Sequence, residues 1–178
     1  MSLPLSEFLR ALDRHMGRIP LDELVRRMAE LSISLRDVER FAHFGHKSYQ
    51  RNLLHAGPAY QALVLCWRSG QRSPIHDHRE SSCGVRVIQG EATETWFDRT
   101  PDGLIYATGS RRLPAGSHCG SQDADIHQMS NLQPPGHDLV TLHVYSPPLM
   151  NMGMYSLTDS RVAEFVDPIV GLLEGAGI

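Results

Sequence analysis

Apolar side chains in the first part of the chain recur every three or four residues. The pattern covers residues 6–16, then 20–31 beginning at Pro20, then 34–44. This spacing matches the helical period of about 3.6 residues, and proline is favoured in the first turn of a helix. We therefore predict three helices within residues 1–45, each with one apolar face that packs on the outside of the remaining fold.

After residue 45 the pattern changes to short apolar or alternating runs. Glycine, proline, asparagine and aspartate separate these runs, which we interpret as strands at 62–67, 84–89, 92–97, 104–107, 125–129, 140–145 and 152–156. Many short strands divided by turn residues are typical of antiparallel sandwiches and barrels. The prediction is a mainly β fold, with a barrel over 46–157 and the helices outside it.

The tail and the chain length complete this outline. Residues 158–178 form a C-terminal tail, in which 160–173 resembles a short helix that Pro168 interrupts. A length of 178 residues is typical of one domain with a substantial core. We expect residues 1–178 to form a single domain, as a monomer or a weak homo-oligomer.

Charge and composition exclude several classes of partner. The formal net charge is −3 with acidic and basic residues interspersed, so we expect no nucleic acid and no anionic membrane surface as a partner. No apolar run approaches the roughly 18 residues that span a bilayer, and the first residues do not resemble a signal peptide. Three widely spread cysteines do not suggest a disulfide framework. We expect a cytoplasmic protein.

A pair of histidines carries the clearest chemical signal. His76 and His78 point the same way only on extended backbone, because side chains alternate along a strand. Pro74 before the pair and Gly90 after the following apolar run are typical of strand borders. Imidazole is a ligand for iron, copper, zinc and nickel. The pair therefore predicts part of a metal site; the alternative is two surface histidines in a turn.

The surrounding spacing resembles the first motif of the cupin superfamily. Gly70 stands six residues before His76, and position 83 and Gly90 follow His78 at the motif's spacing. Most cupins carry a glutamate ligand at the position held here by Cys83. The resemblance implies an antiparallel β-barrel of the jelly-roll type that holds a metal in its mouth.

The second cupin motif is also present. His127-Gln-Met-Ser-Asn131 supplies its His-x3-Asn, whereas Pro114-Ala-Gly116 lies earlier than the usual Pro-x-Gly. Five signatures in order then resemble the thiol dioxygenases, and most closely cysteine dioxygenase: Tyr49-Gln-Arg51-Asn52-Leu53, Cys66-Trp67, Ile75-His76-Asp77-His78, His127-x3-Asn131 and Leu142-His143-Val144-Tyr145-Ser146-Pro147-Pro148. This resemblance implies an Fe(II) enzyme without organic cofactor. It would use O2 as co-substrate to oxidise a small-molecule thiol, L-cysteine, to cysteine sulfinic acid.

The ligand set itself favours a sulfur substrate. If His76, His78 and His127 bind one metal, all three ligands are uncharged. A site of two histidines and a carboxylate would bring a negative ligand. Without it the metal keeps its full charge and can accept an anionic thiolate, which metal coordination also helps to ionise.

The resemblance assigns the substrate carboxylate to Arg51, with Tyr49 orienting it through its hydroxyl. A guanidinium offers a rigid pair of donors matched to a carboxylate. Related enzymes that act on 3-mercaptopropionate are expected to carry glutamine at this position, so Arg51 favours cysteine. The alternative is a surface arginine in a salt bridge.

Tyr145 and His143 share one face of a predicted strand, and the resemblance places them beside the reacting atoms. A tyrosine hydroxyl can donate a hydrogen bond or a proton there, while His143 orients it and Thr141 replaces the family's serine. Cys83 is the candidate for a thioether crosslink to Tyr145, unless a slip of one residue puts Gly84 in its place. The alternatives are a core tyrosine and histidine, and a small buried cysteine without chemistry.

Other residues and other functions stay open. We interpret His118 and Cys119 as loop residues because Pro114, Gly116 and Gly120 surround them, and we assign Met152 to core filling. Two functions compete with a cysteine dioxygenase. One is the same chemistry on another thiol, 3-mercaptopropionate or cysteamine. The other is a non-redox metal-binding cupin, an isomerase or a ligand-binding module.

Overall fold

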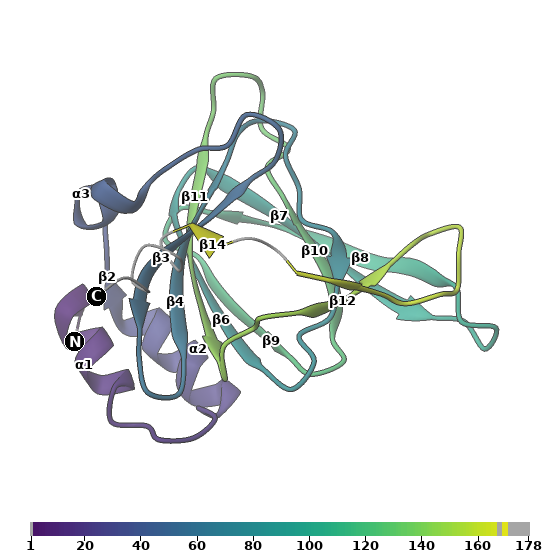
Figure 1. Ribbon diagram of the computed structural model, residues 1–178. Coiled ribbons are helices and arrows are strands. Elements are labelled where there is room, and N and C mark those ends of the chain that lie inside the picture. Colours follow the sequence, from purple (N-terminus) through teal and green to yellow (C-terminus); the bar gives the residue numbers. More distant parts are fainter. Residues whose placement is uncertain (1, 167–168, 171–178) are drawn as a thin grey trace.

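Two six-stranded sheets face each other in the computed structural model, and helices cover the outside of one of them (Figure 1). The structure describes residues 2–166 and 169–170. The N-terminal elements are β1 (Leu3–Pro4), α1 (Leu5–Leu12), α2 (Leu21–Glu30), β2 (Leu31–Ser32), α3 (Leu35–Val38) and a 3-10 turn, η1 (Glu39–Phe41). Strands β1 and β2 pair in parallel, which ties the chain before α1 to the end of α2.

The helix-covered sheet has the strand order β14-β3-β4-β11-β6-β9. Its strands are β14 (Ile169–Val170), β3 (Gln50–Ala56), β4 (Gln61–Trp67), β11 (Leu139–Ser146), β6 (Ser82–Gln89) and β9 (His118–Gln122). All neighbours are antiparallel except β14 and β3. This sheet supplies one wall of the barrel interior.

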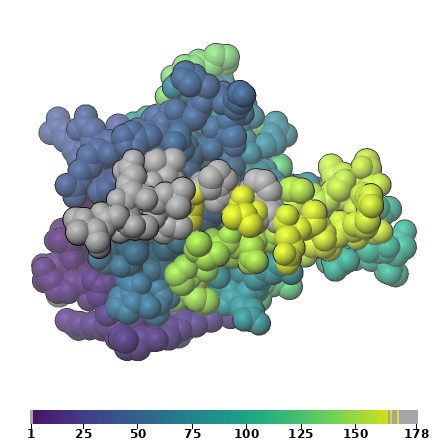
Figure 2. Space-filling view, viewed as in Figure 1, coloured from purple at the N-terminus to yellow at the C-terminus, as the bar shows by residue number. Residues whose placement is uncertain are grey.

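The opposite sheet has the order β13-β12-β5-β10-β7-β8. Its strands are β13 (Ala163–Phe165), β12 (Met152–Tyr155), β5 (Ile75–His76), β10 (Ile126–Ser130), β7 (Glu91–Arg99) and β8 (Ile105–Pro114). Figure 1 shows β8 and β13 extending beyond the barrel, and Figure 2 shows residues 147–166 lying across the face toward the viewer. Two antiparallel sheets of this kind, with helices outside, form a cupin fold.

Strand β4 shows why the covered sheet is apolar on both faces. Its seven residues are all buried. Leu63, Leu65 and Trp67 point into the barrel core, while Val64 and Cys66 pack beneath the helical side. A strand with both faces covered reads as a continuous apolar run rather than an alternating one.

The N-terminal helices bury one apolar face each on this sheet. Phe8 of α1 and Leu24 and Met28 of α2 are fully buried and pack with Leu142 and Val144 of β11. Burying such side chains stabilises the fold by roughly 1.5–3 kcal/mol each. The predicted position of the helices outside the barrel is confirmed.

All seven predicted strands are present, with shifted ends, and β3 is one of the strands that were not predicted. The two polar residues Arg51 and Asn52 are buried in β3, so the apolar pattern of a strand is hidden there. The loop predicted around His118 and Cys119 is wrong, because both lie on β9. Gly120 lies within this strand rather than in a turn. Its lack of a side chain leaves room for α2, which an added side chain would contact.

The helix predicted over 160–173 is also wrong within the described residues. β13 pairs with β12, and β14 pairs with β3. Pairing with these sheet edges replaces the helix that the local sequence favours. The predicted helix also includes 167–168 and 171–173, which lie outside the described residues. No helix in 2–166 is long and apolar enough to cross a membrane.

We predict that Gly120→Ala destabilises the contact between α2 and β9. The added Cβ would lie 2.5 Å from Val25 Cγ2 and 2.8 Å from Leu21 Cδ1, so the helix must shift. Overpacking of this kind costs about 1–3 kcal/mol, measurable as a lower midpoint in urea denaturation. Gly17→Ala is the matched control, because no atom lies within 4 Å of its added Cβ, and its unfolding free energy should change by less than about 0.5 kcal/mol. Equal stabilities of the two variants would contradict the packing described here.

Candidate metal centre

Three buried histidines converge at one end of the barrel. His76 on β5 lies directly opposite His127 on β10, and His78 follows two residues after His76 on the same face. The ring centroids are 4.7–5.2 Å apart, and one nitrogen from each ring lies within 4.8 Å of the others. Among the described residues, this is the one group of three or more metal-ligating side chains so arranged.

Hydrogen bonds behind the rings set which nitrogen faces the centre. His76 Nδ1 lies 2.9 Å from the carbonyl of Pro74, an acceptor, so this nitrogen carries the proton and Nε2 keeps its lone pair. His127 Nδ1 makes the same kind of bond, at 2.9 Å, to Glu94 Oε1. His78 is held less firmly: its Nε2 lies 3.4 Å from Ser121 Oγ, and its buried Nδ1 has no hydrogen-bond partner in the described structure.

The protonation states suit a metal ion. Burial, and next the neighbouring His127, lower the pKa of His76 to about 3. Burial also lowers the pKa of His78 well below its ordinary value. Both imidazoles are therefore neutral at physiological pH and have lone pairs to share. Three converging ring nitrogens, two of them on neutral imidazoles, fit a divalent transition metal.

Glu94 is a site residue that our sequence interpretation missed. It is 1% exposed on β7 and accepts from His127 through Oε1, while its Oε2 accepts a hydrogen bond from Arg111 Nε of β8 and forms an ion pair with Arg111 Nη2. Burial raises the pKa of Glu94, but the interactions with His127 and Arg111 outweigh it and leave the pKa below its ordinary value. The signal available in the sequence was its place two residues after Ala92, on the inward face of a predicted strand.

Asp77, between two of the histidines, was passed over as well. Its Oδ1 accepts a hydrogen bond from the Gly153 backbone at 2.9 Å, and its Oδ2 accepts one from the Tyr155 hydroxyl at 2.8 Å. A side chain at Gly153 would lie 2.5 Å from this carboxylate. Asp77 therefore ties β12 to the segment that carries His76 and His78.

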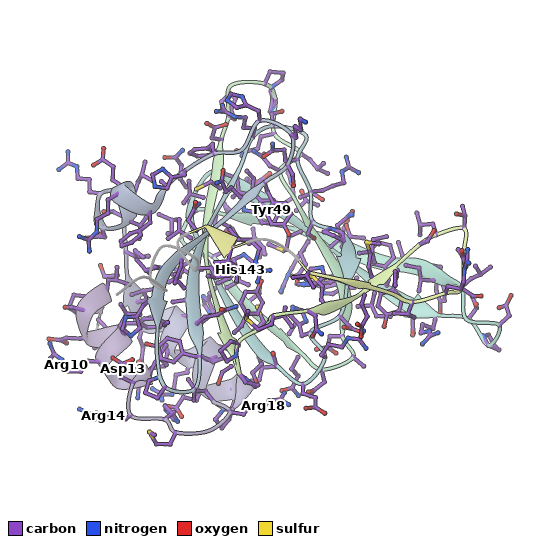
Figure 3. All side chains as sticks on the ribbon, in the orientation of Figure 1. Arg10, Asp13, Arg14, Arg18, Tyr49 and His143 are labelled. Atoms are coloured by element: carbon purple, nitrogen blue, oxygen red, sulfur yellow. The ribbon has the colours of Figure 1, made fainter. Side chains whose placement is uncertain are left out.

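A small enclosed cavity lies beside the histidines. Two of them line it, together with residues of both sheets: Tyr49, Arg51, Trp67, His143, Tyr145 and Met152. Tyr49 and Trp67 stack with ring centroids 4.2 Å apart. Figure 3 shows Tyr49 and His143 toward the middle of the barrel. Met152, for which we favoured core filling over lining the substrate cavity, borders both the cavity and the core.

Arg51 brings a positive charge into this cavity. It is 2% exposed on β3, its Nη2 donates to the carbonyl of Leu149 at 3.3 Å, and its guanidinium lies 5.5 Å from the ring centroid of Tyr145. A surface arginine, the alternative left open above, does not describe this position. A buried cation of this kind can bind an anionic group that enters the cavity.

A chain of hydrogen bonds leads to the Tyr145 hydroxyl. Trp67 Nε1 donates to Thr141 Oγ1 at 3.0 Å, Thr141 Oγ1 lies 3.0 Å from His143 Nε2, and His143 Nδ1 lies 3.1 Å from the Tyr145 hydroxyl. Burial lowers the pKa of His143 well below its ordinary value, so the ring is neutral. A neutral imidazole between two hydroxyl groups can accept from one and donate to the other.

Cys83 rather than Gly84 faces this chain. Cys83 lies directly opposite Tyr145 on the neighbouring strand, and the Tyr145 hydroxyl interacts with its thiol. A side chain at Gly84 would point the other way and contact Leu24 and Met28 of α2 at 3.3 Å. Burial raises the pKa of the Cys83 thiol well above its ordinary value.

The other candidates do not join the histidine cluster. His118 is exposed, and Cys119 is buried next to it. Burial raises the pKa of both Cys119 and Cys66 to about 12. The three cysteines are unpaired and buried, which agrees with the absence of a disulfide framework expected from the sequence.

Comparisons with known proteins agree with this site. Two solved structures share the fold: a Thermus thermophilus protein (TM-score 0.53, 15% identity, 65% of this chain and 99% of that one) and a Klebsiella pneumoniae protein with a double-stranded β-helix domain (TM-score 0.52, 16% identity, 67% and 94%). "Cysteine dioxygenase type 1" of Danio rerio is 30% identical over 138 residues, 75% of this chain and 68% of that protein.

The Homo sapiens protein of the same name is 32% identical over 114 residues, 61% of this chain and 56% of that protein. The family model for cysteine dioxygenase type I matches residues 5–158. This range includes the site residues that both sheets contribute. With three buried histidines converging inside that matched region, the chain belongs to the cysteine dioxygenase type I family.

Proposed function

We propose that this protein is an Fe(II)-dependent thiol dioxygenase that oxidises L-cysteine with O2 to cysteine sulfinic acid. The observation that carries the proposal is the buried Arg51 in the same small cavity as His76 and His127. That cavity offers a cation for the substrate carboxylate and a metal centre for its thiol. The family membership supports this chemistry but leaves the choice of thiol to be tested.

The three-histidine centre suits an anionic sulfur ligand. His76, His78 and His127 would hold the metal through neutral nitrogens, so no negative ligand competes with a thiolate. Bound Fe(II) would supply the activation of dioxygen, which redox-inactive zinc does not provide. The enclosed cavity keeps bulk water from the reacting atoms and strengthens the electrostatic interactions within it.

Arg51 and Tyr49 would orient the amino-acid end of the substrate. The guanidinium of Arg51 is held by the carbonyl of Leu149 and by its position over the Tyr145 ring, so it does not need to reorganise on binding. Tyr49 is fixed by stacking on Trp67. A carboxylate fixed in this way brings the thiol to a defined place beside the histidines.

Tyr145 would direct a proton or hydrogen bond to the reacting atoms. Because Trp67 Nε1 can only donate, Thr141 Oγ1 accepts from it and can give its own proton to His143 Nε2. His143 Nδ1–H can then donate to the Tyr145 oxygen, which orients the phenol. A donor-only group at the start of the chain is compatible with this tautomer.

The proposal includes a thioether between Cys83 Sγ and the Tyr145 ring. The two residues are direct cross-strand partners in contact. Forming the bond removes the thiol hydrogen and one ring hydrogen, and dioxygen takes up these two protons and two electrons as hydrogen peroxide. The link would fix the phenol beside His143.

Arg51→Gln should lower kcat/KM for L-cysteine about tenfold to a hundredfold. Hydrogen bonds to a charged group contribute about 1.5–3 kcal/mol, and each 1.4 kcal/mol is about a factor of ten. The test is oxygen uptake by Fe(II)-loaded protein with L-cysteine, 3-mercaptopropionate and cysteamine. The loss should be seen with L-cysteine and should be absent with cysteamine, which has no carboxylate. Arg68→Gln is the control, since Arg68 is exposed over the Phe44 ring, away from the cavity.

Two results would contradict this assignment. Unchanged L-cysteine kinetics in Arg51→Gln would remove Arg51 from substrate binding. Faster turnover of cysteamine or 3-mercaptopropionate than of L-cysteine by the unaltered protein would assign a different thiol.

The thioether should appear as an intact mass lower by two hydrogens after turnover with L-cysteine. Mass spectrometry of peptides would locate the link between Cys83 and Tyr145. Cys83→Ser should abolish the mass change, and Cys119→Ser should keep it, because Cys119 is not paired with Tyr145. A free Cys83 thiol after exhaustive turnover would reject this part of the proposal.

Anaerobic addition of Fe(II) should raise the melting temperature. Ligand at about 100 times its Kd stabilises a protein by about 2.7 kcal/mol, which corresponds to roughly 5–10 °C for a chain of this size. His127→Ala should lose most of the shift, because one of three ligand nitrogens is gone. His118→Ala should retain it, as His118 is exposed on β9. A full shift in His127→Ala would place the metal elsewhere.

A further inference from the structure

The three histidines of the centre are supported in three different ways. His76 is bonded to a backbone carbonyl, and His78 has a long contact with the Ser121 hydroxyl. His127 alone is bonded to a carboxylate, Glu94 Oε1, at 2.9 Å. Both members of this pair are nearly fully buried, with side chains 3% and 1% exposed. The three imidazole rings therefore differ in the hydrogen-bond partners that support them.

The oxygens of the Glu94 carboxylate bind two main partners, and the Cys119 thiol also interacts with the carboxylate. Oε1 takes the His127 ring, whereas Oε2 takes Arg111 Nε at 2.9 Å and Nη2 at 2.7 Å. Arg111 in turn lies over the ring of Trp96, 5.1 Å from its centroid. The arginine side chain is 41% exposed, so this row of residues extends from the protein surface to the metal centre.

We propose that Glu94 and Arg111 form a positioning pair that makes His127 the most electron-donating of the three ligands and thereby sets the affinity and the reduction potential of the bound iron. The inference rests on the metal-binding part of the proposed function. Neither residue touches the metal or the substrate cavity, and both act through the imidazole of His127.

The physical argument starts from the hydrogen bond. A carboxylate that accepts the Nδ1–H of a metal-ligating histidine fixes the ring's tautomer and orientation and raises the basicity of Nε2. Two-histidine, one-carboxylate centres hold a negative group directly on the metal. Here the negative group is placed one residue further out, behind His127. The centre receives part of its electron donation while the coordination position stays free of an anion.

Arg111 limits this effect. Its positive charge withdraws negative charge from Glu94, and its hydrogen bond through Nε and ion pair through Nη2 hold the carboxylate in one orientation. Trp96 restricts the guanidinium by stacking. The sign of each contribution is therefore defined: Glu94 stabilises Fe(III) relative to Fe(II), and Arg111 opposes it.

The test uses the full-length protein loaded anaerobically with Fe(II). In Glu94→Gln the charge is lost, and the single amide oxygen can accept from only one of the two donors, His127 Nδ1–H or Arg111, so His127 loses its carboxylate partner in either orientation. We expect the Kd for Fe(II), measured by competition with a chelator, to rise about tenfold to a hundredfold. We expect the Fe(III)/Fe(II) midpoint potential, measured by redox titration, to become more positive. A loss of local packing alone has no reason to shift the potential in this direction.

Glu91→Gln is the matched control. Glu91 and Arg112 form another ion pair across the same two strands, at 3.4 Å, with Arg112 78% exposed. This variant removes the same charge from β7 without touching His127, so its Fe(II) affinity and midpoint potential should equal those of the unaltered protein. Equal values in Glu91→Gln and Glu94→Gln would overturn the inference.

Arg111→Gln gives an independent readout that also serves if Glu94→Gln does not fold. It leaves the carboxylate on His127 and removes its cation, so the midpoint potential should become more negative, opposite to Glu94→Gln. A shift to more positive potential, or none, would overturn the inference. Arg111→Lys keeps the positive charge, so its midpoint potential should lie close to that of the unaltered protein.

These measurements separate the inference from the proposed function. Fe(II) affinity and potential are read without a thiol substrate. If they shift as expected and the protein oxidises no thiol, the proposed substrate chemistry fails and the role of Glu94 stands. If L-cysteine is oxidised but the potential of Glu94→Gln equals that of the unaltered protein, the proposed function stands and the role of Glu94 fails.

Discussion

The site depends on one constraint: each polar side chain that is buried inside the barrel needs a hydrogen-bond partner within the protein. His127 is paired with Glu94, His143 with Thr141, and Arg51 with a backbone carbonyl. A buried polar group without a partner costs about 1–3 kcal/mol. The partners that satisfy these groups also fix their orientation, so the stability of the barrel interior and the geometry of the site have the same origin.

The two sheets divide the chemistry between them. The histidines come from β5, the residues just after it, and β10 in one sheet, whereas Arg51, Cys83 and Tyr145 come from β3, β6 and β11 in the other. Neither sheet carries a complete site. The three histidines and the cavity residues Arg51 and Tyr145 meet only when the sheets pack face to face, with apolar residues such as Leu65 and Met129 filling the rest of the interior.

The sequence was most informative where a local period or a spaced motif determines position. The apolar stripes of α1 and α2 and the alternation around His76 and His78 are of this kind, and both predictions were confirmed. The sequence was least informative where a contact with a distant segment of the chain determines the local structure. β14 forms by pairing with β3. Gly120 stands within a strand because α2 packs too closely there for a larger side chain. Glu94 resembles an ordinary strand residue until β8 and β10 are placed on either side of it.

The burial of every sulfhydryl in this chain has a practical consequence for enzymology. Cys66, Cys83 and Cys119 are 0–5% exposed, and their pKa values are raised by burial, so little thiolate is present at neutral pH. Thiol-directed dyes react with the thiolate form of accessible cysteines. Such a dye, added to the folded protein, would therefore report the concentration of a free small thiol in solution with almost no background from the protein itself.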